Sequence, residues 1–163
     1  MSRDTPSSSP SAAAPSHDQT IAARIVALEI LGAIFEKGTA LDVALSDAPS
    51  YQAINTLDRA LVRMMVMTTL RRLGQIDDMI AYAMDTDEPP DPPALQALLR
   101  LSVAQLIFMD IPDHAAVSVA VDTAVRAGLA RQKGLVNAVL RRLAREGRDI
   151  TTRQDIARLN VPS

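Results

Sequence analysis

The stretch IPDHAAVSVAVDTAVRAGLARQKGLVNAVLRRLAR, residues 111–145, predicts two helices joined by a short basic loop. Pro112 ends the preceding segment, and Asp113 is of a residue type that caps helix N-termini. Apolar residues follow at helical spacing until Gly128, which ends the first helix. A second apolar stripe begins at Leu135 and runs through Leu143. This half of the chain is therefore expected to be a pair of packed helices.

The second part of this stretch is strongly basic. Seven basic residues and one acid, Glu146, lie between positions 126 and 148, which gives a local charge of +6 in a chain of net charge −2. Such a concentration of positive charge is typical of a surface that binds a polyanion. Taken singly, an arginine is more often a solvated surface residue or a partner in a helical ion pair than an RNA contact. The basic residues are Arg126, Arg131, Lys133, Arg141, Arg142, Arg145 and Arg148.

Composition places the whole chain in the all-α class. Of its 163 residues 48% are hydrophobic, only 2% are aromatic, and the apolar content comes mainly from helix-favouring alanine and leucine. Apolar periodicity predicts helices over residues 20–36, 41–46, 56–73, 76–84 and 93–109, before the two helices of the opening stretch. The middle of 56–73 is apolar nearly all round, which predicts a helix surrounded by others. Helix 93–109 is the expected core helix.

Changes in composition predict the domain limits. Residues 1–19 are rich in Ser, Pro and Ala, and are expected to be a disordered tail. Residues 20–147 form the helical domain of about seven helices, and the acidic, Pro-rich segment 85–93 is expected to divide it into two subdomains. The polar residues 148–163 are expected to be a linker toward a C-terminal domain.

Several kinds of chemistry find no support in the sequence. There is no cysteine, the six glycines do not cluster into a phosphate-binding loop, and no serine has a plausible histidine partner. His17 and His114 lack the partners that a zinc site needs, so no metal is expected. No apolar run is long enough to span a membrane, and the start does not read as a secretory signal. We therefore expect a cytoplasmic chain that is not itself a catalyst.

The motif Leu-Val-Asn-Ala-Val-Leu-Arg-Arg at 135–142, in its place after the Ile-Pro turn and a helix, resembles the NusB-like domain. With Leu-Arg-Arg-Leu-Gly-Gln-Ile-Asp at 70–77, it is most similar to the N-terminal domain of the RsmB (Sun/Fmu) small-subunit rRNA 5-cytosine methyltransferases. The resemblance covers about residues 21–145. It implies a NusB-like bundle that binds 16S rRNA and presents it to a C-terminal methyltransferase domain. That domain would bind S-adenosylmethionine and supply two catalytic cysteines, so no cofactor is expected in this chain.

Two other functions remain open. NusB antitermination factors, which bind boxA RNA with a ribosomal-protein partner, begin with an arginine-rich segment, of which only Arg24 stands here. They also tend to have an acid where Arg141 stands. Both departures favour the methyltransferase branch. A protein-interaction module is the third possibility, with the basic face docking on an acidic partner or on the chain's own catalytic domain.

The candidate RNA-binding residues come from both halves of the chain. Arg59 and Arg63 are four residues apart and share a helix face, so with the other basic residues they could form one groove that follows an RNA backbone. Asn137, within an apolar run, is expected to satisfy backbone groups of a neighbouring loop. The predicted RNA-binding set is Arg24, Arg59, Arg63, Arg71, Arg72, Arg131, Lys133, Arg141, Arg142 and Arg145.

Overall fold

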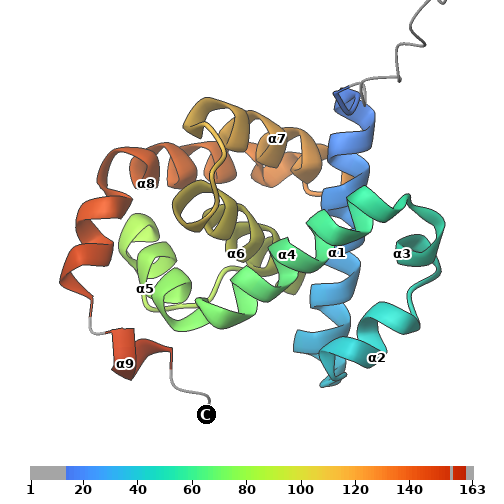
Figure 1. The fold of residues 1–163 in the computed structure, drawn as a ribbon. Coiled ribbons are helices and arrows are strands. Elements are labelled where there is room, and N and C mark those ends of the chain that lie inside the picture. The colour runs from blue at the N-terminus through green and yellow to red at the C-terminus, as the bar shows by residue number, and fades with distance from the viewer. Residues whose placement is uncertain (1–13, 155, 161–163) are drawn as a thin grey trace, which may run out of the picture.

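The computed structural model describes residues 14–154 and 156–160, and every regular element in these ranges is a helix (Figure 1). The all-α class is confirmed. In chain order the elements are α1 (His17–Lys37), α2 (Leu41–Ser46), α3 (Pro49–Ala53), α4 (Thr56–Arg71), α5 (Leu73–Met84), α6 (Pro93–Phe108), α7 (Asp113–Arg126), the 3-10 turn η1 (Ala130–Gln132), α8 (Lys133–Arg153) and α9 (Ile156–Leu159).

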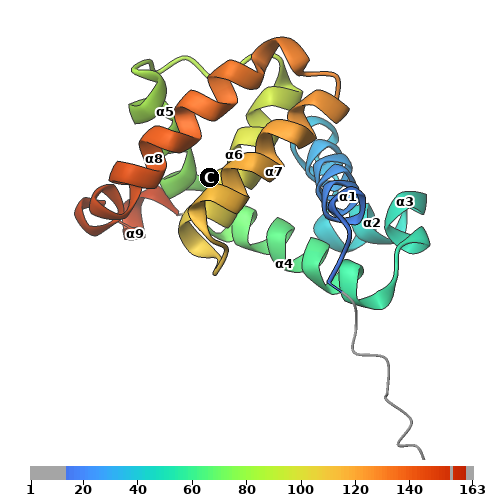
Figure 2. The ribbon, with the colours of Figure 1, turned by 90° about the horizontal axis from the view of Figure 1, so that it is seen from above.

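Helix α6 lies in the middle of the bundle (Figures 1 and 2) and packs against α1, α4, α5, α7 and α8. Pro93 starts it, where the missing N–H costs no hydrogen bond. Nearly every side chain from Leu95 to Leu106 is buried, including the polar residues Ser102 and Gln105. The prediction of 93–109 as the core helix is therefore confirmed.

Two apolar clusters form the core. One joins α1, α2 and α4 with Leu101 of α6, and the other joins α5, α6, α7 and α8. The expected division at segment 85–93 was wrong, because α5 precedes that segment and yet packs into the second cluster through Ile76, Met79 and Ile80. The two halves meet between α4 and α5, and α6 contributes to both.

Helix α4 is not surrounded by other helices, contrary to the prediction for 56–73. Only one of its faces is buried, through Val62, Met65, Val66 and Thr69. Met64, in the middle of the apolar run, is 58% exposed. The prediction was wrong because several residues on the outer face of this helix are also apolar, so its amphipathic pattern is not visible in the sequence.

The ends of several helices differ from the predicted limits. Helix α1 begins at His17, because Ser16 and Gln19 form a capping box there, so residues 17–19 of the expected tail are helical. Residues 1–13 of that tail lie outside the described residues. Helix α3 lies between the predicted helices 41–46 and 56–73, where no helix was predicted. Helix α8 continues through the buried Gly147 to Arg153, six residues beyond the predicted domain limit.

The segment after α8 is bound to the start of α5. The Asn160 Oδ1 atom accepts a hydrogen bond from the Gln75 backbone N–H at 3.0 Å, and Gln154 Nε2 donates to the Gln75 carbonyl at 3.1 Å. Gly74 leaves room for the carbonyl of Leu159, which any side chain at this position would overlap. Residues 154 and 156–160 are thus held against the domain. That residues 148–163 lead toward a further domain stays a prediction.

Candidate nucleic-acid interface

A groove of about 580 Å³ runs between α7 and α8. Val117, Val121 and Ala144 supply its apolar part, and the polar residues His114, Ser118 and Asn137 also line it. The cations Arg141 and Arg145 lie on the α8 side, one helical turn apart and both exposed. Because α8 buries its opposite face in the core, these two side chains are held at the surface by a well-anchored helix.

Arg141 and Arg145 have no carboxylate within ion-pair distance in the described part of the chain, although Asp113 and Asp122 line the same groove. Neither forms an ion pair there, and Arg141 Nε donates only to the Asn137 Oδ1 atom at 3.2 Å. Asn137 therefore bonds to a side chain of its own helix, and not to the backbone of a neighbouring loop as predicted. Arg131 and Lys133, at η1 and the start of α8, are likewise exposed and outside these ion pairs.

Three of the seven clustered cations are paired with acids. Arg148 bonds to Asp113 at 3.1 Å, Arg126 bonds to Asp18 at 3.0 Å, and Arg142 bonds to Glu146 at 2.9 Å. Asp113 and Asp18 lie outside residues 126–148, so the local charge of +6 overstates the positive charge of this surface. The hydrogen bond to Asp113 raises the pKa of Arg148 above its usual value. Four of the seven, Arg131, Lys133, Arg141 and Arg145, remain without a carboxylate partner among the described residues.

Arg142 faces α5 instead of the α7–α8 groove. Its guanidinium lies 4.5 Å from the centre of the Tyr82 ring, bonds to Glu146 at 2.9 Å, and donates to the Ala83 carbonyl at 3.4 Å. The hydrogen bond to Glu146, followed by that to Tyr82, raises the pKa of Arg142. Arg142, a member of the predicted RNA-binding set, therefore lies on a different face of α8 from Arg141, because successive helical residues point about 100° apart.

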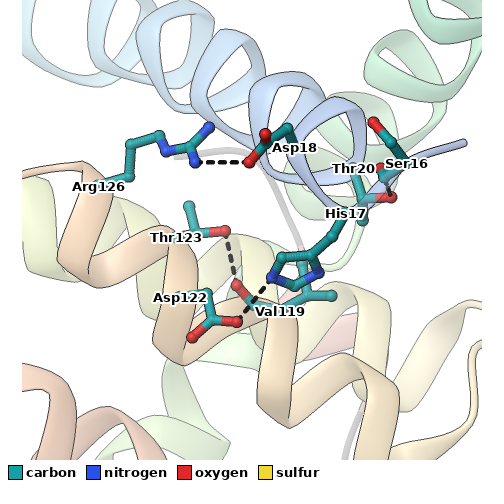
Figure 3. Close-up of polar contacts among 8 residues, drawn as sticks. All are labelled: Ser16, His17, Asp18, Thr20, Val119, Asp122, Thr123 and Arg126. Atoms are coloured by element: carbon teal, nitrogen blue, oxygen red, sulfur yellow. Dashed lines mark hydrogen bonds and ion pairs between the residues drawn. The ribbon is translucent and has the colours of Figure 1, made fainter.

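Two side-chain contacts join the start of α1 to α7 beside this groove (Figure 3). His17 Nε2 lies 2.8 Å from Asp122 Oδ2, and the Arg126 guanidinium holds Asp18 one residue further along α1. Asp122 also lines the α7–α8 groove. The imidazole of His17 is therefore in contact with a carboxylate that lines the groove.

Arg24 is not part of an accessible basic surface. Its side chain is buried, with the residue only 8% exposed, and Nε donates to Gln105 Oε1 of α6 at 3.0 Å. A second bond runs to the Thr20 carbonyl at 3.3 Å. Burial lowers the pKa of Arg24, and the charge of Asp58 opposes this shift. The structure therefore places this predicted RNA-binding residue in the core between α1 and α6.

The four arginines at 59–72 lie on a different side of the molecule. Arg63 and Arg71 are exposed on α4, whereas Arg59 is half-buried and bonds to Thr56. Arg72 lies 5.0 Å from the centre of the Phe108 ring. Helix α6 packs between α4 and α8, and no residue of α4 lines the α7–α8 groove. The single groove predicted from the sequence is therefore divided into two separate basic faces.

The described residues provide neither a metal site nor a Rossmann-type cofactor site. Within 14–154 and 156–160, no group of three or more His, Asp and Glu side chains could hold a metal ion. These residues form no strand, so they do not build the strand–glycine loop–helix unit that binds S-adenosylmethionine in Rossmann domains. No described helix is both long enough and apolar enough to cross a membrane.

The helical arrangement and the sequence together define the class of protein. The model of the NusB family matches residues 21–145, which is most of the chain and the range expected from the sequence motifs. The chain belongs to the NusB family.

Relatives of known function are longer than this chain. It is 39% identical over 128 residues to ribosomal RNA small subunit methyltransferase B of Xanthomonas campestris pv. campestris, and 32% identical over 131 residues to the protein of that name from Serratia proteamaculans. The alignments cover 78% and 80% of this chain, but only 29% and 30% of the two relatives. The chain thus spans less than a third of their length.

Solved structures share the fold at lower sequence identity. The T. maritima NusB structure superposes with a TM-score of 0.66 at 21% identity, over 82% of this chain and 92% of that one. A chain in the crystal structure of a plectonemic RNA supercoil superposes with a TM-score of 0.71 at 20% identity, over 79% of this chain and 96% of that one. At these identities the likeness establishes the fold.

Proposed function

We propose that this NusB-family domain binds small-subunit (16S) ribosomal RNA and positions it for a cytosine-C5 methyltransferase domain. The observation that carries the proposal is the α7–α8 groove, where Arg141 and Arg145 stand exposed without a carboxylate partner among the described residues. The similarity to the two methyltransferases B supports the choice of RNA.

The groove suits a single-stranded or looped RNA backbone. A guanidinium binds phosphate oxygens through two parallel hydrogen bonds, and Arg141 and Arg145 offer two such groups along one helix face. Arg131 and Lys133 add positive charge where α8 begins. His114, Ser118 and Asn137 provide hydrogen-bonding groups for base edges or ribose hydroxyls.

In this proposal the domain contributes affinity and orientation, and catalysis belongs to another domain of the methyltransferase. S-adenosylmethionine would bind to that domain, which would also be a partner of this one in the cytoplasm. An antitermination factor is the less favoured function, because the relatives with the higher identities are methyltransferases. Moreover, Arg24, the one arginine retained at the start of α1, is buried.

The test measures binding of the full chain to labelled fragments of small-subunit rRNA by fluorescence anisotropy at several salt concentrations. We expect Arg141→Glu/Arg145→Glu to weaken binding by about tenfold or more at low salt, because two phosphate contacts are lost and two anions are added. The slope of log K against log salt should shrink by roughly 0.7 per lost contact on single-stranded RNA.

A matched control reverses the charge of two arginines on α4, outside the groove. Arg63→Glu/Arg71→Glu makes the same change in net charge on α4 and should weaken RNA binding much less. Arg141→Lys/Arg145→Lys keeps the charge and should retain most of the affinity. If the α8 double variant is folded by circular dichroism and binds RNA with unchanged affinity and slope, the α7–α8 groove is not the RNA site.

A further inference from the structure

The outer face of α4 presents large apolar side chains to solvent. Leu57 is 72% exposed and Met64 is 58% exposed, the two highest values among the large apolar residues in the described part of the chain. They lie seven residues apart, hence two turns along one face, with the exposed Ala60 between them. A single exposed leucine needs no explanation, but an aligned group on one helix face does.

Two arginines accompany these apolar side chains. Arg71 follows Met64 by seven residues and shares its face, whereas Arg63, one residue before Met64, lies about 100° around the helix, at the edge of the exposed surface. Both are exposed, and neither is in an ion pair with a described residue. The only acid in α4, Asp58, is bonded to Asn55 and lies near the buried Arg24. The outer face is therefore both apolar and positively charged.

This combination favours a protein over RNA as the partner. Leucine and methionine offer little to phosphate groups, and no exposed aromatic side chain lies on α4 to stack with a base. An amphipathic helix with acidic flanks would instead bury its apolar stripe on Leu57, Ala60 and Met64. Its carboxylates would pair with Arg63 and Arg71, which are about 12 Å apart along the helix axis.

We propose that the outer face of α4, formed by Leu57, Ala60, Arg63, Met64 and Arg71, is the docking surface for an acidic amphipathic helix of a protein partner. Figure 1 shows α4 lying across the front of the bundle with no other element before it, and Figure 2 shows it on the far side of α6 from α8. A helix on this face would leave the α7–α8 groove open, so RNA and protein could be bound together.

The test uses two synthetic 18-residue peptides. In the first, leucines form one helical stripe flanked by glutamates, and in the second serines replace the leucines. Binding of each to the full chain is measured by titration calorimetry, with amide chemical shifts to locate the contact. We expect the leucine peptide to bind and to shift the amide signals of α4, and the serine peptide to bind at least about tenfold more weakly because burial of apolar area is lost.

Variants then separate the two contributions. We expect two double variants to lower the affinity for the leucine peptide by about fivefold or more each, as is usual when central anchors are removed. These are Leu57→Ser/Met64→Ser and Arg63→Glu/Arg71→Glu. Arg63→Lys/Arg71→Lys should recover most of the affinity. Arg141→Glu/Arg145→Glu changes net charge equally and should leave peptide binding unaltered. All substituted positions are exposed. Circular dichroism of each variant is the control for correct folding.

The proposal is overturned if the two peptides bind equally or if the α4 variants bind the leucine peptide as well as the parent does. It is also overturned if Leu57→Ser/Met64→Ser reduces affinity for rRNA fragments, since α4 would then be an RNA face. Loss of RNA binding in the α8 variant with normal peptide binding supports both proposals. Failure of the RNA proposal alone leaves the peptide results unchanged.

Discussion

The α7–α8 groove and the outer face of α4 each present two arginines that form no ion pair with any residue that the structure describes. The side chains around the two pairs of arginines differ. Arg141 and Arg145 stand beside a hollow with His114, Ser118 and Asn137. Arg63 and Arg71 stand beside exposed aliphatic side chains on a single helix. Positive charge alone therefore does not identify a ligand. The neighbouring groups decide whether hydrogen bonding to a nucleic acid or burial of apolar surface can accompany the charge.

Other arginines belong to neither basic face, because their side chains bond to neighbouring helices of the fold. Arg100 of α6 makes two hydrogen bonds of 2.8 Å to the Asp77 carboxylate of α5 and lies 4.5 Å from the centre of the Phe35 ring of α1. One side chain thus connects three helices. A high arginine content in this protein reflects structural contacts as well as any binding surface.

The largest expected effect concerns Arg24, which belongs to the core and to neither face. Arg24→Met should lower the free energy of unfolding by about 2–3 kcal/mol, because the buried Gln105 loses a charged hydrogen-bond donor. Arg63→Met, on the surface, should change it by less than about 0.5 kcal/mol. Urea unfolding followed by circular dichroism measures both. A fully stable Arg24→Met variant with weakened RNA binding would return Arg24 to the RNA-binding set.

A smaller effect is expected for substitutions of Arg142 and Arg145, which lie on different faces of α8. Arg142→Ala should lower Tm by a few degrees, because contacts with Glu146, Tyr82 and the Ala83 carbonyl are lost. It should leave the salt dependence of RNA binding nearly unchanged. Arg145→Ala should do the reverse, with unaltered Tm and a smaller salt slope. Thermal melts and anisotropy titrations on both variants check this, and equal effects on RNA binding would show that the two arginines act on one face.

The smallest expected effect is an increase in RNA affinity, whereas the variants above lower stability or affinity. Asp122 lines the α7–α8 groove, so Asp122→Asn removes a negative charge that repels phosphates. Affinity for rRNA fragments at low salt should rise by roughly twofold to threefold, as for a nearby charge largely screened by solvent. Asp42→Asn, at an exposed acid of α2 outside the groove, is the control and should have no effect. If Asp122→Asn weakens binding, the contact with His17 is needed to shape the groove.

Helix positions and the family were accessible from sequence because their signals are local. Pro93 starts α6, Gly38 ends α1 in a left-handed conformation, and apolar periodicity gave most of the buried face of α8, although Leu135 at the start of the predicted stripe is exposed. The motif at 135–142 identified the NusB family. Local signals failed for α4, where apolar residues occupy both faces, and at Gly147, which packs closely against the Ile107 side chain inside α8 and does not end the helix.

By itself the sequence determined an all-helical NusB-family domain with an excess of arginine near its C-terminal helix pair. Only the tertiary structure decided which arginines are free, because their partners are distant in sequence: Asp18 for Arg126, Asp113 for Arg148 and Gln105 for Arg24. Helical periodicity specifies which face a residue occupies but not what packs against that face. Packing of α4 and α8 against the buried helix α6 therefore placed the arginines of the predicted groove on two separate basic faces.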